Sequence, residues 1–150
     1  MTTTPTTTPT ADSRALALAH YAARGVLESV LARYDVTFQQ SVALRVLAVA
    51  EGPVGREVVV RQVAGSLKAD ADDVRGVVEE LVGKGLCAPE GAALRLTDAG
   101  REFYAASGAE TAEISARIWA GIPAEDLAAT GRVLALVRER ADAELAALAK

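Results

Sequence analysis

The chain has 150 residues, of which 51% are apolar and only 4% aromatic, and its formal net charge is −4. This length predicts one domain, and the negative charge gives the chain as a whole no electrostatic reason to bind nucleic acid or an anionic membrane. A single cysteine, Cys87, excludes an intramolecular disulfide and a cysteine-built zinc site.

The N-terminal part of the sequence predicts a tail and two helices. Residues 1–12 are mostly Thr and Pro without apolar periodicity, which predicts a disordered tail. From Ser13 onward, mainly apolar residues recur at steps of three and four residues, which is the spacing of one face of a helix of about five turns. That face carries Leu16, His20, Ala23, Leu27, Val30, Leu31 and Tyr34. A second helix is predicted over 38–51, with Val42, Val46 and Val49 facing inward.

The central part predicts a helix-turn-helix followed by a β-hairpin. In chain order we expect a short β-branched strand over 56–59, a helix over 60–67, a second helix over 71–84, and strands over 86–88 and 93–96. This order is that of a winged helix, a module that places a reading helix in the major groove of DNA and a loop against the flanking backbone.

The C-terminal part predicts two more helices. Thr97 is a suitable cap for a helix that runs toward Trp119, and Pro123 is suited to the first position of the last helix. The last helix has an apolar stripe formed by Leu127, Leu134, Val137, Ala141, Leu145 and Leu148.

The predicted fold class is therefore mostly α with a small β-hairpin, in one domain of residues 13–150. A winged-helix lobe of about 38–97 lies between long terminal helices of about 14–35 and 98–148. So small a lobe cannot cover the apolar stripes of the long helices. We therefore expect these helices to pair with those of a second copy in a homodimer.

Several stretches of the chain resemble the MarR family of ligand-responsive winged-helix repressors. They are TFQQ with LRVL (37–40 and 44–47), the segment 60–67, ELVGKGL (80–86), LTDAGR (96–101) and IPAEDL (122–127). The resemblance extends from about residue 14 to the C-terminus. It implies a two-fold dimer built from the terminal helices, two winged-helix lobes, and a small-molecule crevice where each lobe meets the dimer helices.

The sequence departs from the family pattern at the expected DNA-binding surface. The resemblance implies Ser, Thr and Arg along the reading helix, whereas this chain has ADADDVRG at 69–76, and no residue of the wing from Pro89 to Leu94 is basic. Between Pro53 and Gly100 there are six basic and eight acidic residues. The net charge of this segment is therefore −2, and it offers few cations for the phosphate neutralisation that supplies most non-specific affinity for DNA.

Four cations of the lobe are candidate DNA-binding residues: Arg61, Lys68, Arg75 and Arg95. Asp70 is suited to cap the reading helix. Asp72 and Asp73 lie in its first turn, where negative charges interact favourably with the positive end of the helix dipole. A structural role of this kind is one interpretation of the three aspartates. The others are that one accepts a hydrogen bond from cytosine N4, or that the helix no longer binds DNA.

Candidate ligand-binding residues lie mainly on the first helix and among the few aromatics. They are His20, Tyr21, Arg24, Tyr34, Gln39 and Trp119. His20 is suited either to a core or interface position or to a polar contact in the crevice. Arg24, one turn beyond His20, is either a solvated surface residue or the partner of a ligand carboxylate.

The sequence gives little support to an enzyme. It has no glycine-rich phosphate loop, nucleophile elbow or metal-ligand spacing, so no catalytic residue, metal or cofactor is predicted. No apolar run approaches the roughly 20 residues of a membrane span, and we expect a cytoplasmic protein without a membrane partner. Two hypotheses follow. The first is a ligand-responsive, DNA-binding transcriptional regulator, and the second is a MarR-like dimer that has lost DNA binding and acts as a small-molecule binder or a repurposed enzyme.

Overall fold

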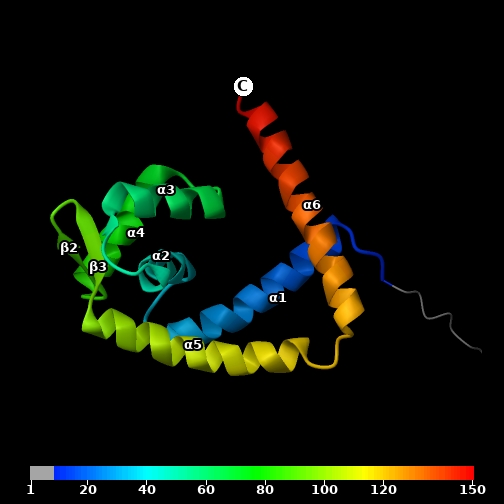
Figure 1. Ribbon diagram of the computed structural model, residues 1–150, viewed down its shortest axis with the longest axis horizontal. Coiled ribbons are helices and arrows are strands. Elements are labelled where there is room, and N and C mark those ends of the chain that lie inside the picture. Colours follow the sequence, from blue (N-terminus) through cyan, green and yellow to red (C-terminus); the bar gives the residue numbers. More distant parts are fainter. Residues whose placement is uncertain (1–8) are drawn as a thin grey trace, which may run out of the picture. The chain divides into compact units, whose positions relative to one another are not determined.

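The computed structural model describes residues 9–150, so most of the predicted N-terminal tail lies outside the described residues. The described helices and strands follow the order expected from the sequence (Figure 1). They are α1 (Ser13–Ala32), α2 (Phe38–Val49), β1 (Val54–Gly55), α3 (Arg56–Leu67), α4 (Ala71–Gly83), β2 (Cys87–Glu90), β3 (Ala93–Leu96), α5 (Asp98–Trp119) and α6 (Ala124–Leu148). The predicted fold class, mostly α with a small β-hairpin, is confirmed.

The prediction of a strand over 56–59 is wrong. These residues form the first turn of α3, and the strand lies just before them at Val54–Gly55. The β-branched side chains are accommodated in the helix because Val59, Val60 and Val63 fall on one buried face. Burial against the lobe core therefore overrides the weak β preference of Val residues.

The core of the lobe is formed by α2, α3, α4 and β3. Leu44 is 0% exposed, and Leu81 and Leu94 are also fully buried. Within α2 the predicted inward position is wrong at Val49, whose side chain is 66% exposed, whereas Val42 and Val46 pack against the core and Leu47, expected beside them, is buried together with Ala43 and Leu44. The packed face of α2 is thus rotated relative to the face expected from the valines alone.

Three short strands form an antiparallel sheet in the order β1-β3-β2. Cys87 pairs with Leu96, and Glu90 pairs with Ala93, so the hairpin closes at Gly91 and Ala92. Gly91 has a φ of +60°, which glycine adopts without strain. The strand β2 continues through Pro89, further than predicted, and Pro89 is tolerated there because β2 is an edge strand.

The first turn of α5 is held against the hairpin. Thr97 accepts a hydrogen bond from the backbone N–H of Gly100 at 3.0 Å, and its hydroxyl donates to the carbonyl of Gly85 at 2.6 Å. The predicted cap at Thr97 is therefore confirmed. Gly100 itself is buried, because α5 passes close to the backbone at Leu86.

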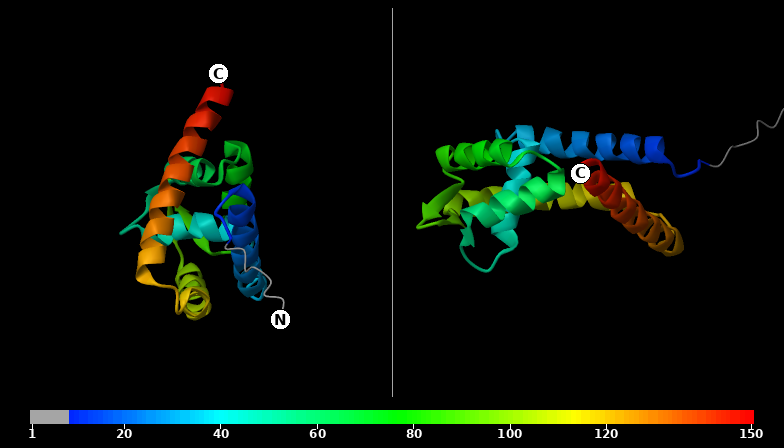
Figure 2. Two further views of the ribbon diagram at one scale, coloured as in Figure 1. Left: turned by 90° about the vertical axis from the view of Figure 1, so that its right-hand side faces the viewer. Right: turned by 90° about the horizontal axis from the view of Figure 1, so that it is seen from above.

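The described residues divide into two compact units, one that ends at Ala112 and one of Glu113–Lys150. The second unit contains the end of α5 and the whole of α6, a single uninterrupted helix (Figure 2). Pro123 was predicted at the first helical position, but it is the N-cap of α6, and the helix begins one residue later at Ala124. No residue of α6 is buried, and its exposed apolar side chains include Val133, Leu134, Leu136, Val137, Leu145 and Leu148.

Candidate functional site

The helix α4 occupies the position of the reading helix in the winged-helix lobe. Asp70 accepts hydrogen bonds from the backbone N–H groups of Asp72 at 2.8 Å and Asp73 at 3.4 Å, so the predicted N-cap role of Asp70 is confirmed. Val74, Val77, Val78 and Leu81 bury one face of α4 in the lobe core. The opposite face is exposed and carries Asp72, Asp73, Arg75, Gly76, Glu79 and Glu80.

Arg75 is the one cation on α4, and carboxylates engage its guanidinium on two sides. Glu57 of α3 accepts from Nη2 at 3.0 Å and from Nε at 3.4 Å. Asp72, one turn earlier on α4, accepts from Nη1 at 2.5 Å. The hydrogen bond from Arg75 lowers the pKa of Glu57, and the hydrogen bond to Glu57 raises the pKa of Arg75.

The other three candidate DNA-binding residues lie on separate elements of the same lobe. Arg61 is exposed on α3, Lys68 ends α3 in a left-handed conformation with a φ of +54°, and Arg95 is exposed on β3. Lys68 also lines a cavity of about 300 Å³ at the turn between α3 and α4. Each of the four cations is thus on the surface of the lobe, and Arg75 is the one on the reading helix.

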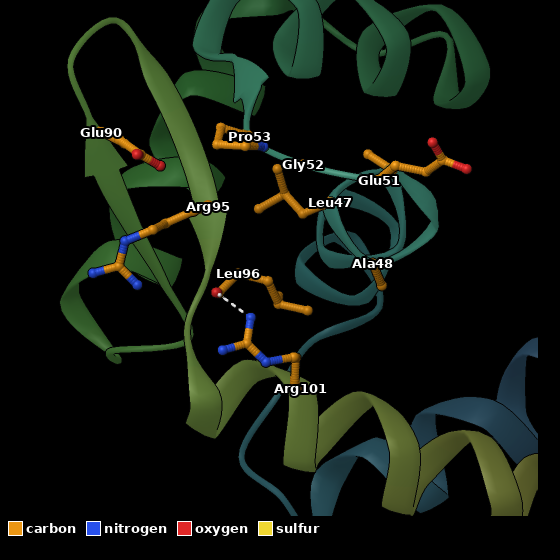
Figure 3. Close-up of a pocket in the computed structure, with 10 residues that line it drawn as sticks. Leu47, Ala48, Glu51, Gly52, Pro53, Glu90, Arg95, Leu96 and Arg101 are labelled. Atoms are coloured by element: carbon orange, nitrogen blue, oxygen red, sulfur yellow. Dashed lines mark hydrogen bonds between the residues drawn. The ribbon is translucent and has the colours of Figure 1, made fainter.

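A depression of about 420 Å³ lies between the end of α2, the loop that follows, and the wing (Figure 3). Arg95 and Arg101 line it together with Glu51 and Glu90. Arg101 donates to the carbonyl of Leu96 at 3.0 Å and pairs with Asp98, whereas the side chain of Arg95 extends away from Leu47 (Figure 3). The carboxylates reduce the positive potential that the two guanidinium groups give this side of the wing.

A second cavity, of about 290 Å³, lies between α1, α2 and the first part of α5, within the first unit. We call it the crevice. Its lining residues are Leu27, Leu31, Phe38, Ser41, Val42, Arg45, Phe103, Tyr104, Ser107, Gly108 and Thr111. An apolar wall with a few polar groups is typical of sites for small organic molecules, and this volume is near the lower end of their range.

Several polar side chains of the crevice are already hydrogen-bonded within their own helices. The hydroxyl of Ser41 donates to the carbonyl of Phe38 at 2.6 Å, that of Ser107 to the carbonyl of Phe103 at 2.8 Å, and that of Thr111 to the carbonyl of Ser107 at 2.9 Å. Each hydroxyl oxygen keeps lone pairs that can accept a hydrogen bond. Arg45 adds an exposed guanidinium from α2, so the crevice combines apolar walls with one full positive charge.

The fold was compared with those of solved structures. The chain is similar to Sco5413, a MarR family transcriptional regulator from Streptomyces coelicolor, at 22% identity, with a TM-score of 0.69, covering 86% of this chain and 91% of that one. It is also similar to Rv2887, a MarR family protein of Mycobacterium tuberculosis in complex with DNA, at 21% identity, with a TM-score of 0.63, covering 85% and 98%. The chain has the fold of MarR family regulators.

The MarR fold is shared with CouR from Rhodococcus jostii RHA1, whose structure contains p-coumaroyl-CoA. That likeness has 20% identity and a TM-score of 0.66, and it covers 79% of this chain and 85% of that one. No family model matches the sequence, and no curated protein matches it. The resemblance drawn from the sequence motifs is therefore confirmed at the level of the fold.

In this MarR fold, two of the six predicted ligand residues contact walls of the crevice without lining it. The guanidinium carbon of Arg24 lies 4.2 Å from the centre of the Phe38 ring, and Arg24 also pairs with Glu28 at 3.1 Å. The ring of Tyr34 meets that of Phe103 edge to face, with 5.4 Å between ring centres. Both contacts fix aromatic side chains that form the crevice wall.

The remaining predicted ligand residues lie elsewhere on the chain. The rings of His20 and Tyr21 are 6.1 Å apart on α1, and both residues are exposed. Gln39 lines the cavity at the turn between α3 and α4, and Trp119 is exposed at the end of α5 in the second unit. Within the first unit, the structure therefore does not bring His20, Tyr21 or Gln39 together with the residues that line the crevice.

Sequence reasoning missed the crevice residues Arg45, Tyr104 and Thr111. A signal for Arg45 was present, because Phe38, Ser41, Val42 and Arg45 recur at three- and four-residue steps along one side of α2. Tyr104 and Thr111 gave no comparable signal, since most of the apolar residues of α5 are alanines, which do not mark one of its faces as covered.

Gln40 links the start of α2 to the reading helix. Its side chain is buried, donates from Nε2 to Glu80 of α4 at 2.7 Å, and accepts from the N–H of Thr37 and from Lys84, each at 3.1 Å. The side chain of Thr37 accepts in return from the backbone N–H of Gln40, which completes a capping box. Hydrogen bonds of Gln40, two residues after Phe38 of the crevice wall, thus join α2 to Glu80 of α4 and to Lys84 at its end.

The lone cysteine and the acidic side chains are groups of this chain that could serve catalytic or metal chemistry. Cys87 is buried at 2% exposure, and burial raises the pKa of its thiol, which disfavours the reactive thiolate. The described residues contain no group of three or more His, Cys, Asp or Glu side chains placed to hold a metal ion. No described helix has the length and apolar character needed to cross a membrane.

Proposed function

We propose that this protein is a homodimeric transcriptional regulator of the MarR type that binds duplex DNA and responds to a small organic ligand. The observation that supports it most directly is the winged-helix lobe, in which α4 exposes one whole face beside a short β-hairpin. A MarR family protein of this fold has been solved in complex with DNA. DNA contacts are assigned to Arg61, Lys68 and Arg95 on the lobe surface, with Arg75 on the reading helix.

The homodimer in this proposal is supported by the second unit of the chain. Its α6 buries none of its own side chains, although it carries many large apolar ones. A helix of this kind gains stability when a partner covers its apolar stripe. Two lobes related by a two-fold axis would then meet two half-sites about one helical turn apart on DNA.

Binding to duplex DNA from the region upstream of the protein's own coding sequence is the first test. A regulator that neutralises several phosphates is expected to lose about 100-fold or more in affinity between roughly 50 and 200 mM salt. Fluorescence anisotropy at several salt concentrations measures this loss, with an unrelated duplex of equal length as control. Equal affinity for both duplexes at every salt concentration would contradict a sequence-specific regulator.

A second candidate function is favoured by the ion pairs of Arg75. With its one cation engaged by Glu57 and Asp72, the exposed face of α4 presents mainly carboxylates. In this alternative the protein has lost DNA binding and keeps the crevice as a small-molecule binding site. The same anisotropy measurement separates the two functions, because this alternative requires no DNA binding even at the lowest salt.

The crevice is proposed to bind a small aromatic or aliphatic carboxylate. Arg45 supplies the positive charge, and the neighbouring apolar walls cover the rest of the ligand. In a thermal-shift screen of small organic acids, Arg45→Ala is expected to weaken binding about 10-fold or more and Arg45→Lys less. Arg33→Ala is the control, since Arg33 pairs with Glu110 and does not line the crevice. Equal loss in Arg33→Ala and Arg45→Ala would contradict the assignment.

A further inference from the structure

The contact between Glu57 and Arg75 joins the two helices of the helix-turn-helix. Glu57 lies in the first turn of α3, and its two carboxylate oxygens accept from Nε and Nη2 of Arg75 on α4. A carboxylate that faces Nε and Nη2 together occupies the edge of the guanidinium that arginine uses for bidentate contacts with phosphate or guanine. Glu57 therefore occupies one of the edges through which Arg75 could bind a nucleic-acid acceptor.

We propose that Glu57 is an autoinhibitory residue that holds Arg75 in an internal ion pair, so that DNA engages the reading helix only when Arg75 is released. This inference rests on the proposed DNA-binding function. It goes beyond that function because it assigns a role to a carboxylate rather than to a cation. Asp72 assists from within α4, because it accepts from Nη1 of the same guanidinium.

The role of Glu57 in folding is small by comparison. Its side chain is 66% exposed and that of Arg75 is 47% exposed. Ion pairs of such exposure contribute little to stability, so removal of the Glu57 charge leaves the fold intact. The pair instead weakens the affinity for DNA, because an approaching phosphate must displace the carboxylate of Glu57 from Arg75 and then lie beside that negative charge.

A neighbouring ion pair supplies a matched control. Arg56 of α3 pairs with Glu79 of α4 at 2.7 Å, and Glu79 is 65% exposed. Glu57→Gln and Glu79→Gln therefore remove the same charge from equally exposed carboxylates, and each breaks one pair between α3 and α4. Only Glu57→Gln releases a cation that lies on the reading helix.

The test measures binding of duplex DNA from the region upstream of the coding sequence, and of an unrelated duplex, to the full-length protein across a salt series. Glu57→Gln is expected to raise affinity about 3- to 10-fold over the wild type and to steepen the slope of log affinity against log salt by about 1, the value for one more neutralised phosphate. Glu79→Gln is expected to change the slope by less than half as much. Arg75→Ala added to Glu57→Gln is expected to abolish the gain.

Each outcome decides the proposal. If the wild type binds DNA and Glu57→Gln binds with equal affinity and slope, the autoinhibitory role is overturned while the regulator remains supported. If the gain persists in the double variant with Arg75→Ala, it reflects general charge repulsion and the role of Arg75 is overturned. If no variant binds either duplex at the lowest salt, the proposed regulator itself fails. Binding by Glu57→Gln alone, with none by the wild type, supports strong autoinhibition.

Discussion

Gly100→Ala is expected to destabilise the lobe by about 3 kcal/mol, the upper part of the range for overpacking a fixed site. A Cβ built on Gly100 lies 2.1 Å from the carbonyl oxygen of Leu86 and 2.8 Å from Cδ1 of Leu96. The leucine methyl can move, but the carbonyl belongs to the backbone and accepts a hydrogen bond from the N–H of Thr97 at 3.2 Å. Relief of the clash therefore requires α5 to move away from the hairpin.

Gly108→Ala on the same helix is the matched control for this prediction. Nothing lies within 4 Å of a Cβ at Gly108, so alanine there is expected to stabilise α5 by roughly 0.5–1 kcal/mol through its higher helix propensity. Urea denaturation of both variants at one protein concentration measures the two free energies of unfolding. Equal stability of the two variants would show that the passage of α5 past Leu86 is looser than the structure indicates.

The same glycine shows why the fold was predictable from the sequence. In the block LTDAG, Thr97 caps α5 and Gly100 follows three residues later. Both lie where α5 passes close to the hairpin, and the close contact with the backbone of Leu86 leaves no room for a side chain at Gly100. The helix starts at Asp70 and Thr97 were also predictable, because an N-cap depends on residues only two or three positions apart in the sequence. The strand predicted over 56–59 was wrong, since four β-branched and charged residues carry no local signal that outweighs burial in the core.

The candidate site was less predictable than the fold. The crevice is formed by residues from α1, α2 and α5, and α5 is far from the other two helices in the sequence, so no local pattern brings Arg45 and Tyr104 together. The acidic character of the reading helix was visible in the sequence, whereas the pairing of Arg75 with Glu57 was not, because the two residues are 18 positions apart and on different helices. Charge counts thus predict the sign of a surface, and only coordinates show which charges are already paired.

Leu134→Asp is expected to convert the proposed homodimer into a monomer, with the dimer dissociation constant rising at least about 100-fold, because a carboxylate would have to be buried in an apolar interface. Leu134 lies on the same face of α6 as Val137 and Ala141, and its side chain is exposed in the single chain. The core of the lobe lies in the first unit and does not include α6, so the monomer is expected to retain its helical circular dichroism.

Ala135→Asp is the control for the dimer prediction. It introduces the same charge one residue along α6, but on the face that carries Arg132 and Glu139, and is expected to leave the dimer intact. Sedimentation equilibrium of both variants measures the dissociation constants. A dimer that Leu134→Asp does not weaken would mean that the stripe on α6 is not the dimer interface. A wild type that is monomeric at all concentrations would contradict the homodimer, and two half-sites on DNA could not then be bound in the proposed way.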